Sequence, residues 1–513
     1  MQLGVDFGTT RTIVSYVDRG NYPVVSFTDA LGDTHDHFPS VAALRDGELV
    51  FGFAALAAAE SGAPVVRSFK RMLAAPDVNA HTPIHFGDRA LALGFVLTGF
   101  LQALLEALRT DSSISGDLAS QIEPQAVVAV PAHAHGAQRF LTLDAFRRSG
   151  FVVLGVLNEP SAAGFEYTHR QARTLSSRRT RVIVFDLGGG TFDASLVAVD
   201  DKRHEVLDSL GLNDLGGDDF DLALAECAAD AAQVDLAELS AQDRAALLDE
   251  CRDAKERLTP QSKRIALEVA GTPVTVQVAD FYDRATPLVE RAIDAMAPLV
   301  GGLDDADDAL AEVAGIYLVG GASSLPLVPR VLRERFGRRV HRSPYPAAST
   351  AIGLAIAADE SSGFSLSDRL SRGFGVFRES AEGEQVDFDP IFDRTTALGP
   401  GAVVEREYDA AHNVGWYRFV EYSRMDADGQ PRGELTPYGE VIFPFDPALQ
   451  QTAELASLTV ARREGGPRIR ETYRVDEQGL VSATILDLST GHRIEIMLTG
   501  ASWPTPTNQR ETR

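Results

Sequence analysis

Two short segments of the chain, about 180 residues apart, share one pattern: an apolar strand-like run, an aspartate, a turn of glycine and threonine, and a second strand-like run. The first covers residues 3–14 and contains Asp6, and the second covers residues 182–196 and contains Asp186. Small residues in such a strand–turn–strand unit let backbone N–H groups approach phosphate oxygens, and threonine hydroxyls add donors. A carboxylate beside the turn can hold Mg²⁺ through water, because magnesium dehydrates reluctantly.

The occurrence of two such loops in one chain is the informative feature, since one glycine loop alone is also typical of a plain hairpin. Two related loops indicate a duplicated fold that clamps a nucleotide from both sides. Neither loop matches the P-loop pattern, and neither leads directly into a helix as a dinucleotide-binding fingerprint does. A third glycine turn, at residues 318–326, joins a strand to a helix, and we expect that helix to face an anion or the nucleoside.

Charge and composition narrow the class of protein. The 48 Lys and Arg against 73 Asp and Glu give a net charge of −25, which disfavours sequence-independent binding to nucleic acid and to anionic membranes. The two cysteines, Cys227 and Cys251, provide no disulfide framework and no zinc site, and we expect them to be buried thiols on helices. No targeting signal is visible, and the apolar stretch 90–108 has the period of an amphipathic helix rather than of a membrane span. We therefore expect a cytoplasmic protein.

The pattern of predicted secondary structure changes once along the chain. Strand-like and helical runs alternate over residues 1–359, which predicts an α/β domain. Residues 360–372 are polar and read as a linker, and residues 373–500 hold short strand-like runs with turn signals, which predicts a β-sandwich. Among these runs are 415–422, expected to border a groove with Trp416 and Tyr417 mainly in the core, and 455–462. Residues 501–513 are predicted to be a flexible tail.

At this point the chain resembles the actin, hexokinase and heat-shock ATPase superfamily, and within it the 70-kDa heat-shock chaperones. The motifs that carry the resemblance lie in order along residues 1–360: 68–73, 130–132 with 137–139, 157–164, 186–193 and 215–221. The resemblance implies an actin-like ATPase domain, that is, a duplicated ribonuclease H-like α/β fold. Beyond the linker, residues 390–398 and 471–496 resemble the entry and the closing strands of the family's peptide-binding β-sandwich, although a generic sandwich is an open alternative.

The resemblance also implies roles for individual residues in phosphoryl transfer to water. Lys70 would place a cation by the γ-phosphate and the attacking water, and Glu159 and Asp193 would orient that water. Asp6 and Asp193 would hold Mg²⁺ through water. The residues implied to bind the nucleotide are Gly8, Thr9, Thr10, Gly188, Gly189, Gly190, Thr191, Gly216, Gly217, Lys255, Gly320 and Gly321.

Several of these assignments have a plainer alternative. Lys70, next to Arg71, could be solvated surface charge, and Glu159, before Pro160, could cap the following helix. The resemblance places Pro131 and Arg139 in a relay that reports the nucleotide state to the linker, whereas a helix start and a surface charge would explain them equally well.

The chain departs from the family pattern in three places. On the helix that usually clamps adenosine, Lys255 is in place, but Arg252 stands where Glu is expected and Glu256 where Arg is common; Ser324 replaces the arginine that stacks on the base. We therefore expect weaker ATP binding, with nucleotide selectivity in doubt. The linker has only three spaced apolar residues, which suggests altered interdomain coupling. We expect no helical lid after Gly500, so bound peptide should dissociate fast.

The leading hypothesis is an ATP-hydrolysing, chaperone-like protein whose nucleotide state tunes transient binding of unfolded or extended peptides by a lidless β-sandwich, with roles in protein folding and the stress response. The implied cofactors are ATP or ADP and Mg²⁺, with K⁺ as a further candidate. The implied partners are client polypeptides, a J-domain co-chaperone and a nucleotide exchange factor. The competing hypotheses are an actin-like polymerising ATPase, a small-molecule kinase and a nucleotide-gated regulator with negligible turnover.

Overall fold

Both hairpins predicted from the glycine turns are formed in the computed structural model. It describes residues 1–119, 121, 123–171, 174–176, 178–300, 310–367, 369–380, 385–399, 401–426, 428–452 and 454–499. β1 (Gln2–Phe7) and β2 (Arg11–Tyr16) pair antiparallel, with Asp6 one residue from the end of β1. β13 (Arg181–Leu187) and β14 (Phe192–Asp200) pair in the same way, with Asp186 at the matching position of β13.

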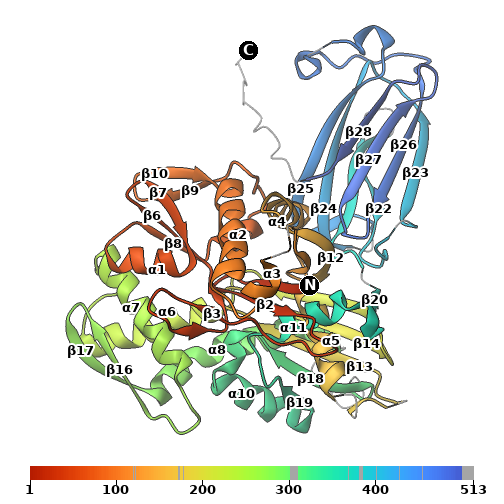
Figure 1. Ribbon diagram of the computed structural model, residues 1–513. Coiled ribbons are helices and arrows are strands. Elements are labelled where there is room, and N and C mark those ends of the chain that lie inside the picture. Colours follow the sequence, from red (N-terminus) through yellow and green to blue (C-terminus); the bar gives the residue numbers. More distant parts are fainter. Residues whose placement is uncertain are drawn as a thin grey trace.

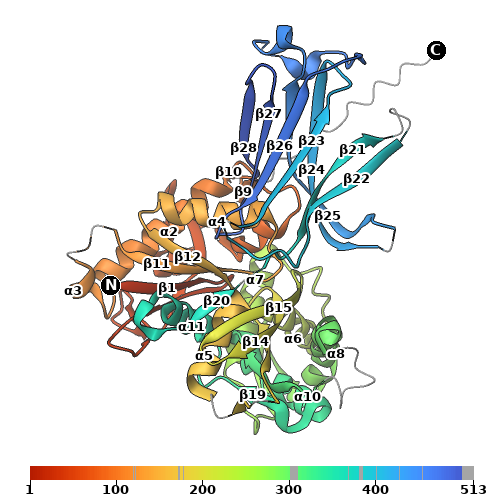
Figure 2. The same cartoon turned by 90° about the vertical axis from the view of Figure 1, so that its right-hand side faces the viewer.

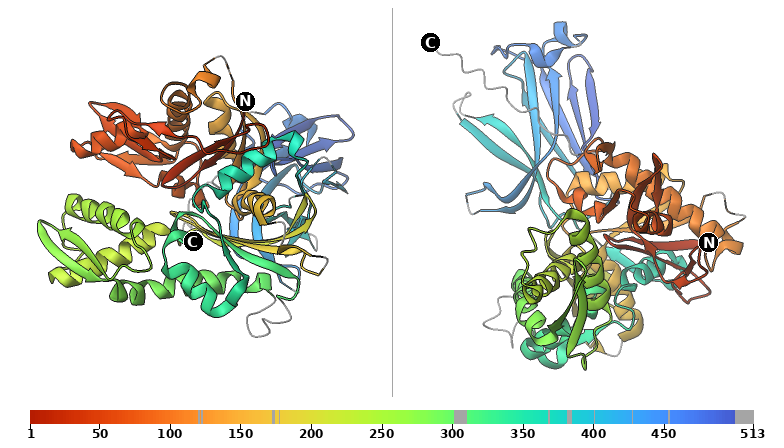
Figure 3. Two further views of the ribbon diagram at one scale, coloured as in Figure 1. Left: turned by 60° about the horizontal axis from the view of Figure 1, so that its bottom comes forward. Right: turned by 90° about the vertical axis from the view of Figure 1, so that its left-hand side faces the viewer.

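Each hairpin is the centre of a larger sheet, and the two sheets repeat one arrangement. The first has the order β12-β11-β1-β2-β5 and the second the order β19-β18-β13-β14-β15-β20. In both, the first strand of the hairpin has a parallel neighbour, β11 or β18, which has a further parallel neighbour in turn. We call the parts built around these sheets lobe I and lobe II (Figures 1 and 3). The remaining strands are β5 (Phe38–Pro39), β11 (Gln125–Val130), β12 (Val152–Asn158), β15 (Arg203–Leu212), β18 (Val313–Val319), β19 (Val340–Arg342) and β20 (Ser365–Ser367).

Two helices lie between the sheets. α11 (Ser349–Ala358) packs on β1, β2 and β11, whereas α5 (Glu159–Gln171) packs on β13 and β14, and the two helices also pack on each other. The sheets therefore face each other through a pair of buried helices, which leaves the two hairpin turns free to meet at one end.

Lobe I has its core around α2 (Leu93–Thr110). Its eight buried residues are the eight that the helical period predicted: Leu93, Val96, Leu97, Phe100, Leu101, Leu104, Leu105 and Leu108. By length and composition α2 could cross a membrane, but these side chains pack into the core of lobe I. The other elements of this lobe are β3 (Phe27–Thr28), β4 (Thr34–His35), β6 (Val41–Arg45), β7 (Glu48–Phe51), α1 (Gly52–Glu60), β8 (Val65–Arg67), the 3₁₀ turn η1 (Phe69–Ala74), β9 (Pro83–Phe86), β10 (Arg89–Ala92), α3 (Ser115–Leu118) and α4 (Gly136–Arg148).

Lobe II surrounds its sheet with longer helices. Cys227 and Cys251 both lie on these helices; Cys251 is buried as expected, whereas Cys227 is only partly buried. The elements are α6 (Gly217–Ala232), α7 (Ala241–Glu256), β16 (Arg264–Val269), β17 (Thr272–Gln277), α8 (Val278–Met296), the 3₁₀ turns η3 (Ala297–Val300) and η5 (Gly321–Ser324), α10 (Leu327–Phe336) and the 3₁₀ turn η6 (Gly337–Arg339).

The segment expected to be a linker takes part in the fold. β20 pairs in parallel with β15 and extends the sheet of lobe II. Phe364, just before β20, packs edge-on against Phe165 and His204. Phe364 and Leu366 of the predicted linker are therefore partly buried against α5 and α11, whereas Leu370 packs on the core of the sandwich. The predicted linker begins with a 3₁₀ turn, η7 (Glu360–Ser362).

The C-terminal part is a β-sandwich of two antiparallel sheets, β22-β21-β24-β25 and β23-β26-β27-β28 (Figure 2). Large aromatic residues such as Phe374, Phe419 and Tyr473 fill the space between them. The strands are β21 (Gly373–Ser380), β22 (Gln385–Phe392), β23 (Val403–Asp409), β24 (Val414–Met425), β25 (Pro431–Pro444), β26 (Arg468–Val475), β27 (Val481–Asp487) and β28 (Arg493–Met497). Two short 3₁₀ turns are η9 (Pro447–Leu449) and η10 (Leu455–Ser457).

Two local predictions for the sandwich are wrong. Residues 455–462 are not a strand: they begin with η10, and their apolar side chains are at most half-buried. Trp416 is not in the core either, because its face carries Arg418 and its indole N–H donates to Glu440, whereas Tyr417 is buried. The predicted tail and the predicted absence of a lid concern residues after Gly500 and lie outside the described residues.

Candidate nucleotide site

The turns of the two hairpins meet at a pocket between the lobes. Backbone and side chains from β1, η1 and α5 approach it from one side, and those from β13, α6, α7 and η5 from the other. Thirteen of the residues predicted from the sequence line it: Asp6, Gly8, Thr9, Thr10, Lys70, Glu159, Gly188, Gly189, Thr191, Gly217, Lys255, Gly320 and Gly321. Segments separated by up to about 340 residues therefore form one concave site.

The other predicted residues lie behind this wall. Gly190 and Gly216 are in direct contact: a Cβ on Gly216 would come within 2.5 Å of the Gly190 backbone. The two glycines therefore allow the second hairpin turn to lie against the start of α6. Asp193, on β14, is fully buried and does not line the pocket.

One end of the pocket holds a buried lysine among carboxylates. Lys70 lies on η1, and its Nζ donates to Oε1 of Glu159, the first residue of α5, at 2.8 Å. Both residues are buried, so Lys70 is not solvated surface charge, and the Glu159 side chain pairs with Lys70. Although burial opposes it, the nearby Glu159 and Asp6 carboxylates raise the pKa of Lys70.

The carboxylates at this end exceed the cations. Burial, and then the charge of Glu159, raise the pKa of Asp6 to about 7. Burial also raises the pKa of Glu159, and it raises the pKa of Asp186 well above its usual range with the help of the neighbouring carboxylates. Such a cluster is short of positive charge, and carboxylate oxygens are the donors that Mg²⁺ takes. The residues present therefore fit a magnesium ion held with nucleotide phosphates.

Asp186 is a pocket residue that we did not predict. It lines the site and occupies the place in the second hairpin that Asp6 occupies in the first. The shared pattern of the two segments was the signal that could have identified it.

Asp193 is held from behind by the segment that joins β11 to α4. Its Oδ1 accepts hydrogen bonds from the backbone N–H of Ala132 at 2.9 Å and from Nδ1 of His133 at 2.9 Å. Burial opposes the charge on His133, but the Asp193 carboxylate outweighs it and raises the pKa of that imidazole. His133 was not among the residues predicted from the sequence.

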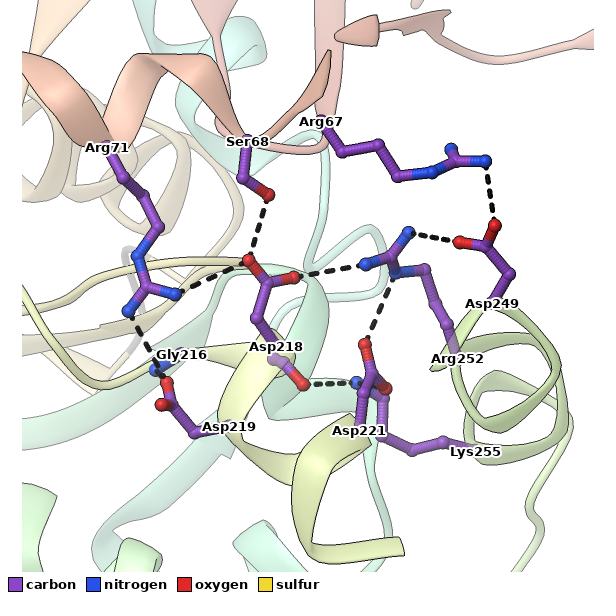
Figure 4. Close-up of polar contacts among 11 residues, drawn as sticks. Arg67, Ser68, Arg71, Gly216, Asp218, Asp219, Asp221, Asp249, Arg252 and Lys255 are labelled. Atoms are coloured by element: carbon purple, nitrogen blue, oxygen red, sulfur yellow. Dashed lines mark hydrogen bonds and ion pairs between the residues drawn. The ribbon is translucent and has the colours of Figure 1, made fainter. Parts of the chain in front are cut away.

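The opposite end of the pocket is lined by charged residues that pair with one another. Lys255 donates to the carbonyl of Gly217 at 2.7 Å and pairs with Asp221 at 2.5 Å (Figure 4). Arg252, where the family pattern has Glu, donates to Asp221 at 3.2 Å and to Asp218 at 3.3 Å. These side chains therefore satisfy one another within lobe II.

Other charges at this end join the two lobes. Glu256 of α7 pairs with Arg11 of β2, and both line the pocket. Further out, Arg67 of β8 donates to Asp249 of α7 at 2.8 Å, and the Ser68 hydroxyl donates to Asp218 of α6 at 2.9 Å (Figure 4). The face of α7 that departs from the family pattern therefore takes part in closing the cleft.

The sandwich rests on α4 of lobe I. The Glu421 carboxylate of β24 accepts the backbone N–H of Gly136, at 2.9 and 3.1 Å, at the N-terminus of α4. Arg139, on the same helix, donates to the carbonyl of Gln478 in the sandwich and to Asn158 of β12, each at 3.0 Å. Burial raises the pKa of Glu421 to about 7. A side chain predicted to relay the nucleotide state is therefore in contact with both domains.

Comparison with known proteins shows which family the chain belongs to. The family model described as Hsp70 protein matches residues 98–371, more than half of the chain. The chain belongs to the Hsp70 family. It is 32% identical over 515 residues to a chaperone protein HscA homolog of Bordetella pertussis, and 31% identical over 516 residues to chaperone protein HscA of Klebsiella pneumoniae. Each alignment covers 96% of this chain and 77% of the relative.

Membership of the Hsp70 family confirms the leading hypothesis from the sequence at the level of function: the protein is an ATP-dependent chaperone that binds client peptides. The chaperone hypothesis is therefore favoured over the hypotheses of a polymerising ATPase and of a nucleotide-gated regulator. A chaperone of this kind binds ATP and ADP and is an ATPase, and the pocket between the lobes is the site whose geometry fits that activity.

Proposed function

We propose that this Hsp70-family chaperone hydrolyses ATP slowly in the pocket between its lobes, and that the nucleotide state tunes transient binding of extended peptides by its β-sandwich. The observation that carries the proposal is the buried Lys70–Glu159 pair among the carboxylates beside both glycine turns. Phosphoryl transfer to water needs charge neutralisation and a positioned water. At this end of the pocket a lysine is available for the first and carboxylates for the second.

In this proposal the residues share the chemistry as follows. Water attacks the γ-phosphorus, the bond to the bridging oxygen breaks, and ADP and inorganic phosphate leave. Lys70 neutralises charge that develops on the γ-phosphoryl oxygens, while Glu159 orients the attacking water together with Asp193, which is buried behind the pocket wall and close enough for its charge to act on Glu159 and Lys70. The threonine hydroxyls of Thr9, Thr10 and Thr191 and the amides of the glycine turns bind phosphate oxygens.

Mg²⁺ would be held through water by Asp6 and Asp193, with Asp186 beside them, and it would supply charge neutralisation on the phosphates. The raised pKa of Asp6 and Asp186 supports this assignment, because both carboxyls lack a compensating cation of their own. K⁺ is a further candidate ion. The matched strand order of the two sheets supports an actin-like duplication of a ribonuclease H-like unit.

Coupling between the domains is supported by their direct contacts. Glu421 and Gln478 of the sandwich bind α4, and β20 joins the sheet of lobe II. The partners we propose are unfolded or extended client polypeptides, a J-domain co-chaperone and a nucleotide exchange factor. We propose a cytoplasmic location for this activity.

The test is the dissociation of a fluorescent, extended apolar peptide from the full chain in ATP and in ADP. We expect faster dissociation in ATP, and we expect the peptide to raise the rate of single-turnover hydrolysis. Lys70→Ala should keep the effect of bound ATP on the peptide but lose hydrolysis. Equal peptide dissociation in both nucleotides, with hydrolysis unaffected by peptide, would contradict the coupling and leave an uncoupled ATPase.

A further inference from the structure

The side chain of His133 lies between two strands of lobe II, although its backbone belongs to lobe I. Its Nδ1 is 2.9 Å from Oδ1 of Asp193 on β14, and its Nε2 is 2.8 Å from Oδ1 of Asn213, the residue after β15. The neighbouring Ala132 N–H donates to the same oxygen of Asp193 at 2.9 Å. One short segment of lobe I therefore supplies two donors to one buried carboxylate of lobe II.

The imidazole has little freedom to move. Gly211 of β15 lies directly against it: a Cβ on that glycine would come within 2.3 Å of Nδ1 and 2.4 Å of Cε1. The ring thus packs on bare backbone, and both ring nitrogens are in hydrogen bonds. A carboxylate held by a ring that is itself fixed has a defined orientation, which is what a group that positions water requires.

The backbone of the same segment is held by the start of the sandwich. The Nε of Arg372 donates to the carbonyl of His133 at 3.4 Å, and the Ser371 hydroxyl donates to the carbonyl of Ala134 at 3.0 Å. Arg372 is buried, and it also binds Thr436 of β25 at 3.0 Å and Glu434. Only one residue therefore separates the sandwich from the Asp193 carboxylate.

We propose that His133 is a positioning residue: its ring holds Asp193, and its carbonyl, held by Arg372, transmits docking of the sandwich to that carboxylate. This inference rests on the proposed hydrolysis in the pocket. His133 does not line the pocket, so its effect should fall on the rate of hydrolysis and not on nucleotide affinity.

A matched pair of substitutions separates hydrogen bonding from packing. His133→Asn keeps an N–H donor two bonds from Cβ, the position that Nδ1 has in histidine. His133→Leu gives a side chain of the same shape as asparagine but without a donor. A lost hydrogen bond to a charged group predicts that His133→Leu lowers single-turnover hydrolysis about ten- to a hundredfold, with Kd for ADP unchanged. His133→Asn should recover most of that rate. Equal rates in both variants, or a wild-type rate in His133→Leu, would overturn the proposal.

A double-mutant cycle tests transmission from the sandwich. We expect Arg372→Ala to slow hydrolysis about three- to tenfold in the wild type and to have no further effect in His133→Leu. The control is Arg394→Ala, which removes another contact of the sandwich, with Asp208 and the Ser209 carbonyl of lobe II, and does not touch the segment. Its effect should be the same in both backgrounds.

The outcomes can be told apart. If Arg372→Ala and Arg394→Ala are both additive with His133→Leu, the transmission through His133 is wrong, while the ATPase assignment stands. If the wild-type chain binds ADP but hydrolyses no ATP, the proposed function fails and this inference fails with it. If His133→Leu does not fold, as shown by circular dichroism, His133→Ala, which also lacks the donor, takes its place as the background of the cycle.

Discussion

The two ends of the nucleotide pocket are built on different principles. At the phosphate end, where we propose that the phosphates bind, charges from both lobes converge on the pocket, and Lys70 faces Glu159, Asp6 and Asp186. At the nucleoside end, where we propose that the nucleoside binds, the charges of α7 pair with α6 and with lobe I, as Arg252 does with Asp221 of α6 and Glu256 with Arg11 of β2. The first arrangement leaves charge unbalanced for a ligand, and the second balances it within the protein. Chemistry and lobe closure are therefore assigned to opposite ends of one cleft.

The largest expected effect is at the phosphate end. Lys70→Ala removes the cation that faces the phosphoryl oxygens, so we expect single-turnover hydrolysis to fall about 10²- to 10³-fold. The control is Arg71→Ala on the same turn, since the ion pairs of Arg71 within the described residues are with Asp218 and Asp219, at 3.5 and 3.7 Å. Arg71→Ala should slow hydrolysis only a few-fold, and equal losses in both variants would contradict the assignment.

At the nucleoside end, installing the family residue should harm the protein. Arg252→Glu would leave the buried Asp221 with one cation fewer and bring a fourth carboxylate to Asp218, Asp221 and Asp249. We expect the free energy of unfolding to fall by roughly 3 kcal/mol, measured by denaturant titration, together with weaker ADP binding. The same charge change at the exposed Arg257 should have little effect. Tighter nucleotide binding by Arg252→Glu would show that the ion pairs do not replace the usual clamp.

The two ends should also differ in their response to pH. Because the pKa of Asp6 is raised to about 7 in the free protein, Asp6 takes up a proton below that pH and must lose it to bind Mg²⁺ and phosphates. Affinity for Mg·ADP should therefore fall about tenfold from pH 8 to pH 6, with proton release on binding. Adenosine, which lacks phosphates, should show a much smaller change. Isothermal titration in two buffers of different ionisation enthalpy measures both quantities.

The smallest effect is expected at the rim of the cleft. Arg67→Asp opposes Asp249, and neither residue lines the pocket, so it should speed ADP release about two- to fivefold without removing a ligand contact. Adding Asp249→Arg should restore only part of the original rate, because Asp249 also pairs with Arg252. The control is Arg284→Ala, which breaks pairs with Glu226 and Asp230 inside lobe II and should leave release unchanged. Stopped-flow release of a fluorescent ADP gives these rates.

Most of the phosphate end could be predicted from the sequence because each hairpin is local: Asp6 and Gly8 are two residues apart, as are Asp186, which we did not name as a site residue, and Gly188. α2 could be predicted because its apolar period is long and regular. The partners at the nucleoside end could not, since Arg67 and Asp249 are 182 positions apart and neither lies in a motif. His133 was missed although it directly follows the motif 130–132, because its contact with Asp193 joins positions 60 residues apart.

The sandwich shows the limit of reading apolar alternation. β21 and β22 lie around the polar run 379–385 and were not identified as strands, whereas the alternating residues of 455–462 form no strand. In both places the outcome depends on pairing with a distant strand, such as β24 for β21, and a short apolar run contains no information about its partner.

The central claim is that hydrolysis depends on one end of the pocket, whereas lobe closure, which holds ADP, depends on the other. One series of measurements on the full chain tests this claim most directly. The rate of ATP hydrolysis at saturation and Kd for ADP are measured for the wild type, Lys70→Ala and Glu256→Ala. We predict that Lys70→Ala loses the rate and keeps Kd, and that Glu256→Ala raises Kd a few-fold and keeps the rate. If both substitutions change the same quantity, or if Glu256→Ala abolishes hydrolysis, the division between the two ends is wrong.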